Sequence, residues 1–90
     1  INLKIEGQSP SCKTRKQQFQ FHLGGYLPPY NALRTKVIPV TIANDNTVNI
    51  GMDLAVFLAE VNLAITPSVM TPGKTAMELA DISAKMFYSE

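Results

Sequence analysis

The chain has 90 residues, of which 46% are hydrophobic and 17% charged, a composition typical of one small globular domain and too apolar for intrinsic disorder. Eight basic and seven acidic side chains leave a formal charge of +1, which excludes the strong basic field that gathers nucleic acid or anionic lipid. No apolar run approaches 18 residues, so no membrane span is predicted, and no signal-peptide pattern is present.

The chain opens on an alternating segment. Apolar residues at positions 1, 3 and 5 alternate with Asn2, Lys4 and Glu6, which predicts a half-buried strand over residues 1–6. Because this pattern starts without an initiator Met, we interpret the chain as processed or partial, with strand partners that it does not wholly supply. The following "GQSPSCKTRK" is predicted to be a loop.

A second strand is predicted over "QQFQFHL", residues 17–23. Its apolar face carries Phe19, Phe21 and Leu23, whereas the only histidine, His22, lies on the opposite face with glutamines. The strand ends at a double glycine, residues 24–25. These glycines provide either a turn that needs positive φ or room for a ligand or another backbone near His22. The double proline that follows predicts an irregular connection.

Two further strands are predicted beyond this connection. The first covers residues 35–43, where Pro39 indicates an edge position because its nitrogen cannot donate to a ladder. Residues 44–46 form a turn, and residues 47–53 form the next strand. Gly51 within that strand indicates a bulge or a close backbone approach.

The rest of the chain is predicted to be more helical. Residues 54–65 are ambiguous between a helical turn and a strand-like run, and Asp53 is favoured as a helix cap. A helix is predicted over 76–87, with Thr75 and Glu78 at capping-box spacing and Phe87 as its core anchor. The predicted fold is mainly β, part of an antiparallel β-sandwich with a short amphipathic C-terminal helix.

The residues permit little catalytic chemistry. With one His and one Cys, the sequence supports no catalytic triad, no paired zinc ligands and no phosphate-binding glycine loop, so an enzyme is disfavoured. Cys12 cannot form an internal disulfide, and near Lys13 and Arg15 it is either a reactive thiol or an inert or partner cysteine. His22, on a polar strand face, is the candidate metal ligand, with Met52 and Met70 as weaker thioether candidates.

Three pieces of the chain follow one another in an order that resembles the C-terminal half of the MbnP-like family, which comprises periplasmic copper-binding proteins associated with methanobactin genes. They are "INLKIEG" (1–7), "FQFHLGGY" (19–26) and "ADISAKMF" (80–87). The matching residues are Lys4, Glu6, Gly7, Phe21, His22, Leu23, Gly24, Gly25, Met52, Asp53, Leu54, Phe57, Ala80, Asp81, Met86 and Phe87.

The resemblance implies that residues 1–90 are the C-terminal portion of one MbnP-like domain, an exported copper-binding β-sandwich of the periplasm or cell surface. In relatives, copper is held by two histidines and a tryptophan oxidised to kynurenine, an oxidation attributed to a di-haem peroxidase of the MauG type. Only His22 carries over as a ligand, since this chain has no Trp and no second His. The missing ligands are expected from the N-terminal half of the domain or from another chain.

Two hypotheses therefore stand side by side. The first is an exported copper-binding protein, active in copper acquisition or handling, to which His22 contributes a ligand. The second is a non-catalytic structural or interaction module of a cell-surface or periplasmic complex, with the same fold and no metal. The imidazole of His22 is expected to have a nearby acceptor, for which Gln20 is one candidate.

Overall fold

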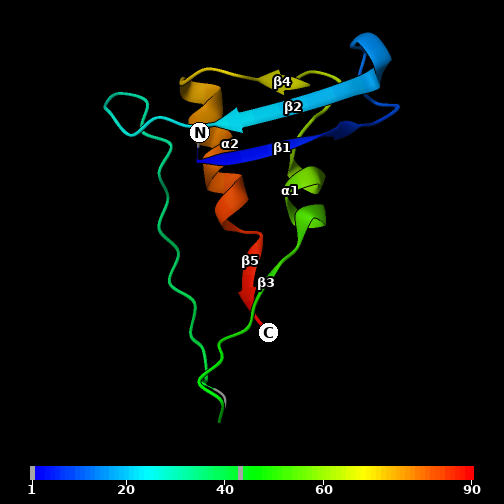
Figure 1. Cartoon of the computed structure of the whole chain (residues 1–90). Helices are drawn as coiled ribbons and strands as arrows, with labels where there is room; N and C mark the ends of the chain where they lie inside the picture. The colour runs from blue at the N-terminus through cyan, green and yellow to red at the C-terminus, as the bar shows by residue number, and fades with distance from the viewer. Residues whose placement is uncertain (1, 43) are drawn as a thin grey trace.

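Two small sheets and two short helices make up the computed structural model, which describes residues 2–42 and 44–90 (Figure 1). Ile1 and Ala43, assigned from the sequence to the first and third predicted strands, lie outside the described residues. The elements in chain order are β1 (Leu3–Gln8), the 3₁₀ turn η1 (Arg15–Gln17), β2 (Gln18–Leu23), β3 (Ile50–Met52), α1 (Leu54–Glu60), β4 (Ser68–Val69), α2 (Lys74–Ala84) and β5 (Phe87–Ser89).

The larger sheet has the strand order β1–β2–β4. Strand β1 runs antiparallel to β2, with Lys4 opposite His22 and Ile5 opposite Phe21, whereas the two-residue β4 runs parallel to β2. Strands β3 and β5 form a separate antiparallel pair. The fold is thus sheet-rich with two short helices. The sequence predicted antiparallel strands, but the larger sheet is mixed, since β4 runs parallel to β2. Strand β4 pairs with the edge of β2 opposite to the one that pairs with β1.

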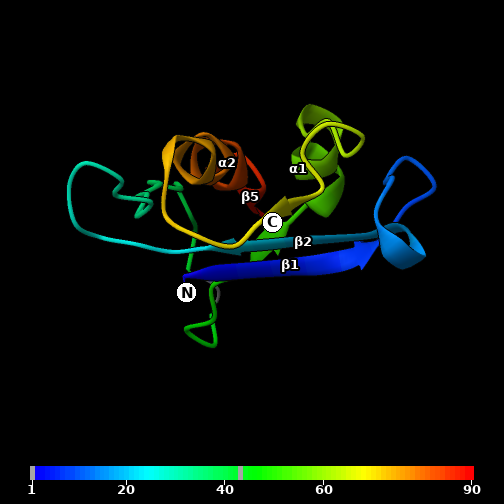
Figure 2. The ribbon, with the colours of Figure 1, turned by 90° about the horizontal axis from the view of Figure 1, so that it is seen from above.

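The helices α1 and α2 cover one face of the larger sheet (Figure 2). That face carries Phe19, Phe21 and Leu23 of β2, all buried, as their alternation predicted. The Phe21 ring meets Phe57 of α1 edge-on, with centroids 5.7 Å apart, and α2 contributes Leu79. The core is therefore a single layer between β2 and the helix pair, and the opposite face carries Lys4, Glu6 and His22.

Two strand glycines each lie under an aromatic ring from the neighbouring strand. Gly7 is opposite Phe19, and a Cβ on Gly7 would lie 2.6 Å from the tip of that ring. Gly51 is opposite Tyr88, whose ring occupies the space that a Cβ of Gly51 would need. Gly51 is in regular register with Tyr88, and what approaches it is an aromatic side chain rather than the bulge or the backbone that the sequence predicted.

The prediction of a strand over 35–43 is wrong for residues 35–42, the part of this range that the structure describes. Residues 35–42 form no ladder, and Val37 and Ile42 are 87% and 64% exposed. A strand exists only where its backbone groups find partners, and here Pro39 removes a donor while no neighbouring strand lies within bonding reach in the described chain. The same lack of partners shortens the strand predicted over 47–53 to Ile50–Met52.

The C-terminal helix differs from its prediction at both ends. Helix α2 starts at Lys74 after an N-cap Gly73 that makes no side-chain cap, so Thr75 lies inside the helix and the predicted capping box is absent. The helix ends at Ala84, and Phe87 belongs to β5, where it is only partly buried. Met86 is the buried anchor instead, at 1% exposure. Pairing of β5 with β3 extends the chain and turns Phe87 away from the helical register.

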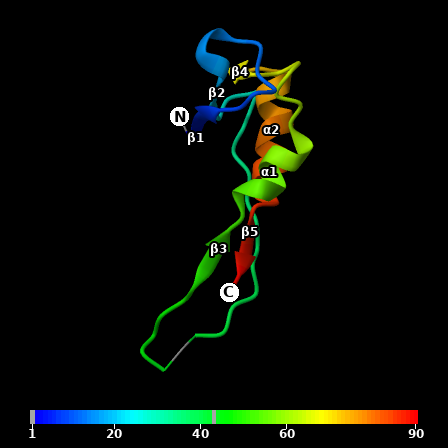
Figure 3. The ribbon, with the colours of Figure 1, turned by 90° about the vertical axis from the view of Figure 1, so that its right-hand side faces the viewer.

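The connection between β2 and β3 is a long arm that leaves the core together with the β3–β5 pair (Figure 3). The Cα radius of gyration is 15.1 Å, larger than the roughly 12 Å expected for a compact domain of this length. Two cations anchor the arm: Arg34 pairs with Asp81 of α2, and Lys36 donates to the Phe87 carbonyl at 2.6 Å. No helix among the described residues is long and apolar enough to cross a membrane.

Candidate metal-binding site

His22 lies near the end of β2, on the sheet face that the helices leave uncovered. Its side chain is nevertheless only 15% exposed, because neighbouring side chains of β1 lie beside it. The alternation of the strand fixes this orientation: Phe21 and Leu23 point into the core, so the imidazole between them must point outward. The sequence-based placement of His22 on the polar face is confirmed.

The imidazole has a partner within the described chain. Its Nε2 lies 3.0 Å from Oε2 of Glu6, which is the diagonal neighbour of His22 on β1. A carboxylate only accepts hydrogen bonds, so Nε2–H donates and Nδ1 is the ring nitrogen without a proton in the neutral imidazole. The sequence suggested Gln20 as a candidate acceptor, but the acceptor in the structure is Glu6.

Lys4 completes a small charged cluster on the same face. Its Nζ lies 3.4 Å from the other carboxylate oxygen of Glu6, so one carboxylate faces both a cation and the imidazole. The hydrogen bond from His22, followed by the hydrogen bond and charge of Lys4, lowers the pKa of Glu6 below its usual range. Glu6 is therefore kept as an anion, the form that best accepts the Nε2–H donor.

The described residues contain no group of three or more His, Cys, Asp or Glu side chains placed to hold a metal ion. The pair His22 and Glu6 offers an imidazole nitrogen and carboxylate oxygens, which are donor types that divalent copper accepts. The fit to copper is thus partial: the chemistry of these donors is suitable, but the described residues supply too few of them for a closed coordination shell.

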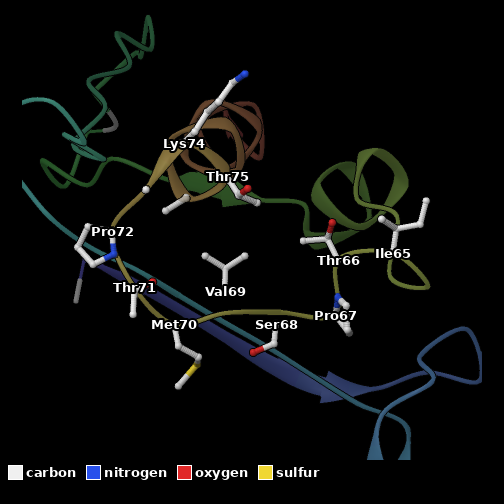
Figure 4. Close-up of a pocket in the computed structure, with 12 residues that line it drawn as sticks. Ile65, Thr66, Pro67, Ser68, Val69, Met70, Thr71, Pro72, Lys74 and Thr75 are labelled. Carbon is white, nitrogen blue, oxygen red and sulfur yellow. The ribbon is translucent and has the colours of Figure 1, made fainter.

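The methionine candidates lie elsewhere. Met52, on β3, is 56% exposed and lines a cavity of about 260 Å³ that Glu6 also borders. Met70 follows β4 and lines another cavity, of about 370 Å³, formed by residues 65–76 (Figure 4). In that cavity Val69 points inward, while Lys74 extends away from it (Figure 4). The described walls of neither cavity include His22.

Cys12 and the double glycine have structural positions. Cys12 is 3% exposed and packs in the hydrophobic core, although its loop carries Lys13 and Arg15. Burial of this kind favours the inert-thiol alternative over the reactive one. Gly25 adopts φ +99°, and its carbonyl accepts the Ala32 amide at 2.9 Å, which supports the turn alternative. Neither feature adds a ligand beside His22.

The contact between His22 and Glu6 was missed from the sequence, although both residues were noted. Sixteen positions separate them, and the signal that could have joined them is the antiparallel pairing of two alternating strands. With Lys4 opposite His22, a residue two positions along β1 becomes a diagonal neighbour on the same face.

Comparison with known proteins gives one match. The family model described as MbnP matches residues 1–71, which include β1, β2 and His22. The closing piece at 80–87 lies beyond the matched region. No curated protein and no solved structure matches significantly. Since the matched region covers more than half of the chain, this chain belongs to the MbnP family.

Proposed function

We propose that this chain binds copper as part of an exported MbnP domain and that His22 supplies one ligand through Nδ1. The observation that carries the proposal is the hydrogen bond from Nε2–H to Glu6. Metal-ligating histidines commonly donate their other ring N–H to a carboxylate, which fixes the tautomer and makes the ligating nitrogen more basic. In this arrangement Glu6 positions the ring, and Lys4 keeps Glu6 ionised.

Copper suits this site better than other first-row divalent metals. Imidazole is a good copper ligand, and copper stands at the top of the divalent affinity order, so few protein ligands are needed to hold it. The remaining donors are proposed to come from polypeptide outside the described residues, either the N-terminal half of the domain or another chain. The two sheets would then belong to a larger sheet-rich domain in the periplasm or at the cell surface.

The proposed role is copper acquisition or handling rather than catalysis. No step of a reaction is assigned to the residues of this chain. A di-haem peroxidase of the MauG type is a proposed partner, by resemblance to relatives in which such an enzyme oxidises a ligand tryptophan.

The test is a copper(II) titration of the complete protein, including the polypeptide that supplies the other ligands. Binding is monitored by calorimetry and by electron paramagnetic resonance. The expected result is a bound ion with nitrogen hyperfine coupling that disappears in His22→Ala. Gln20→Ala, on the same strand and the same face, is the matched control and should leave the spectrum unchanged. Unchanged stoichiometry, affinity and nitrogen coupling in His22→Ala would discard His22 as a ligand.

A second role is favoured by a separate observation. The imidazole already has a partner in its own chain, and the described residues provide no set of three ligating side chains. A scaffold or interaction module without metal would use the His22–Glu6 pair only to tie β1 to β2. If the copper titration of the complete wild-type protein shows no saturable site, while His22→Ala still destabilises the fold, this second role is supported.

A further inference from the structure

Strand β1 is an edge strand with an open side. Among residues 2–42 and 44–90 it pairs with β2 only, in the order β1–β2–β4. The Ser9 amide donates to the Gln17 carbonyl at 2.8 Å, so Ser9 and Gln17 are a hydrogen-bonded pair that continues the antiparallel ladder. Since the ladder alternates, Leu3, Ile5 and Gly7 direct their backbone groups to β2, and the even-numbered residues direct theirs outward. The outward groups of Lys4, Glu6 and Gln8 are therefore available to another strand.

The side chains along this edge are complementary to a second copy of the same edge. If two β1 strands pair antiparallel about Ile5, Lys4 of one copy lies opposite Glu6 of the other, and this charge pair occurs twice. Both residues direct their backbone groups outward, so each opposed pair is a hydrogen-bonded one. Their side chains lie on the same face of the joined sheet, where directly opposed charges of opposite sign stabilise an antiparallel pair.

The apolar side of the edge also fits this pairing. Ile5 of each copy faces Ile5 of the other in the close, non-hydrogen-bonded position, and Leu3 faces Gly7, over which the Phe19 ring already lies. A cavity of about 260 Å³ runs beside β1 and is lined by Leu3, Ile5, Met52, Leu54 and Met86, with Lys4 and Glu6 also on its border. The second copy's Ile5 would enter beside this apolar wall.

We propose that the free edge of β1 is a homodimer interface, in which two chains join their β1–β2–β4 sheets into one six-stranded sheet through a two-fold axis at Ile5. The contact is isologous, so it closes on itself and leaves no free β1 edge for further growth. The dimer needs no metal, although Lys4 and Glu6 also form the charged cluster beside His22.

The experiment measures the oligomeric state of the full chain by sedimentation over a range of concentrations, in EDTA so that no metal bridges two chains. Wild type is expected to show a monomer–dimer equilibrium. Lys4→Glu and Glu6→Lys each place like charges opposite one another and should weaken the dimer at least tenfold. An equimolar mixture of the two variants restores both charge pairs and should form a heterodimer, and the double variant Lys4→Glu/Glu6→Lys should dimerise again.

Matched controls carry the same charge changes on α2, away from the edge. Lys74→Glu and Glu78→Lys, both at exposed positions, should leave the dimer unchanged. Circular dichroism checks that each variant is folded. If Glu6→Lys does not fold because it removes the partner of His22, the comparison of Lys4→Glu with Lys74→Glu still decides. A wild-type chain that stays monomeric, or a mixture that associates no better than either variant alone, overturns the proposal.

Discussion

His22 of β2 and Glu6 of β1 are joined across the sheet by a 3.0 Å contact between Nε2 and Oε2. The strand register places Lys4 directly opposite His22, and Glu6 two residues further along β1. The Glu6 side chain therefore reaches the ring along the diagonal. This one relationship orients the imidazole, selects its tautomer and lowers the pKa of Glu6. It is therefore the first relationship to test.

The pKa of Glu6 should rise toward its usual range in His22→Ala, because the largest cause of its depression is removed. A carboxyl with a depressed pKa stabilises the folded chain above its unfolded pKa, and the contribution is lost as the pH falls through the folded pKa. The stability difference between wild type and His22→Ala should accordingly shrink in acid. A carbon-detected NMR titration of the Glu6 carboxyl measures the pKa, and an identical titration curve in the variant would contradict the contact.

Glu6→Ala should weaken copper binding without abolishing it. Loss of the outer hydrogen-bond partner of a ligating histidine typically lowers metal affinity by roughly 10–100-fold. Glu6→Gln keeps an oxygen that accepts from Nε2–H and should lose less affinity. Competition with a chelator of known affinity measures both. Equal affinity in wild type and Glu6→Ala would show that Glu6 does not position the ring.

Met86, rather than Phe87, should dominate the stability of the C-terminal segment. Met86 is 1% exposed within the core cluster, so Met86→Ala should cost about 2–5 kcal/mol of unfolding free energy. Phe87→Ala should cost less, since Phe87 lies on β5 and only partly enters the core. Urea denaturation of the two variants checks the order, and the reverse order would mean that Phe87, not Met86, anchors this segment to the core.

Gly7→Ala should be more destabilising than Gly51→Ala, although each glycine lies under an aromatic ring. The ring over Gly7 belongs to Phe19, which is buried and cannot move without disturbing the core, so a cost of about 1–3 kcal/mol is expected. Tyr88, over Gly51, is 47% exposed and has room to swing aside. Denaturation midpoints at a constant m-value give the comparison.

Asp53→Ala should destabilise the chain by about 0.5–2 kcal/mol, whereas Thr75→Ala should change stability by less than about 0.5 kcal/mol. The Asp53 carboxylate accepts the Ala55 amide at 3.0 Å and caps α1, but Thr75 lies inside α2 and caps nothing. Asp53→Asn retains a capping oxygen and serves as the control. A larger loss at Thr75 than at Asp53 in thermal and urea unfolding would restore the capping box predicted from the sequence.

Several features could be predicted because they depend on residues close together in the chain. The alternation in residues 18–23 fixed which side chains are buried, and Asp53 was identified as a cap from its place before an apolar run. Gly51 was predicted to mark a bulge or a close backbone approach, but it is the Tyr88 ring, from a distant strand, that lies over it. Features that need a distant partner were predicted less well: residues 35–42 have strand-like composition but no pairing strand, and no strand was predicted where β4 pairs with β2.

By itself, the sequence determined the faces of β1 and β2, and with them the outward position of His22, because alternation within a strand is a local property of the backbone. Only the tertiary structure decided that Glu6 meets the imidazole, that Met86 replaces Phe87 in the core, and that one edge of β1 stays open. Each of these depends on register or pairing between segments far apart in the chain, and a one-residue shift between β1 and β2 would separate Glu6 from the imidazole.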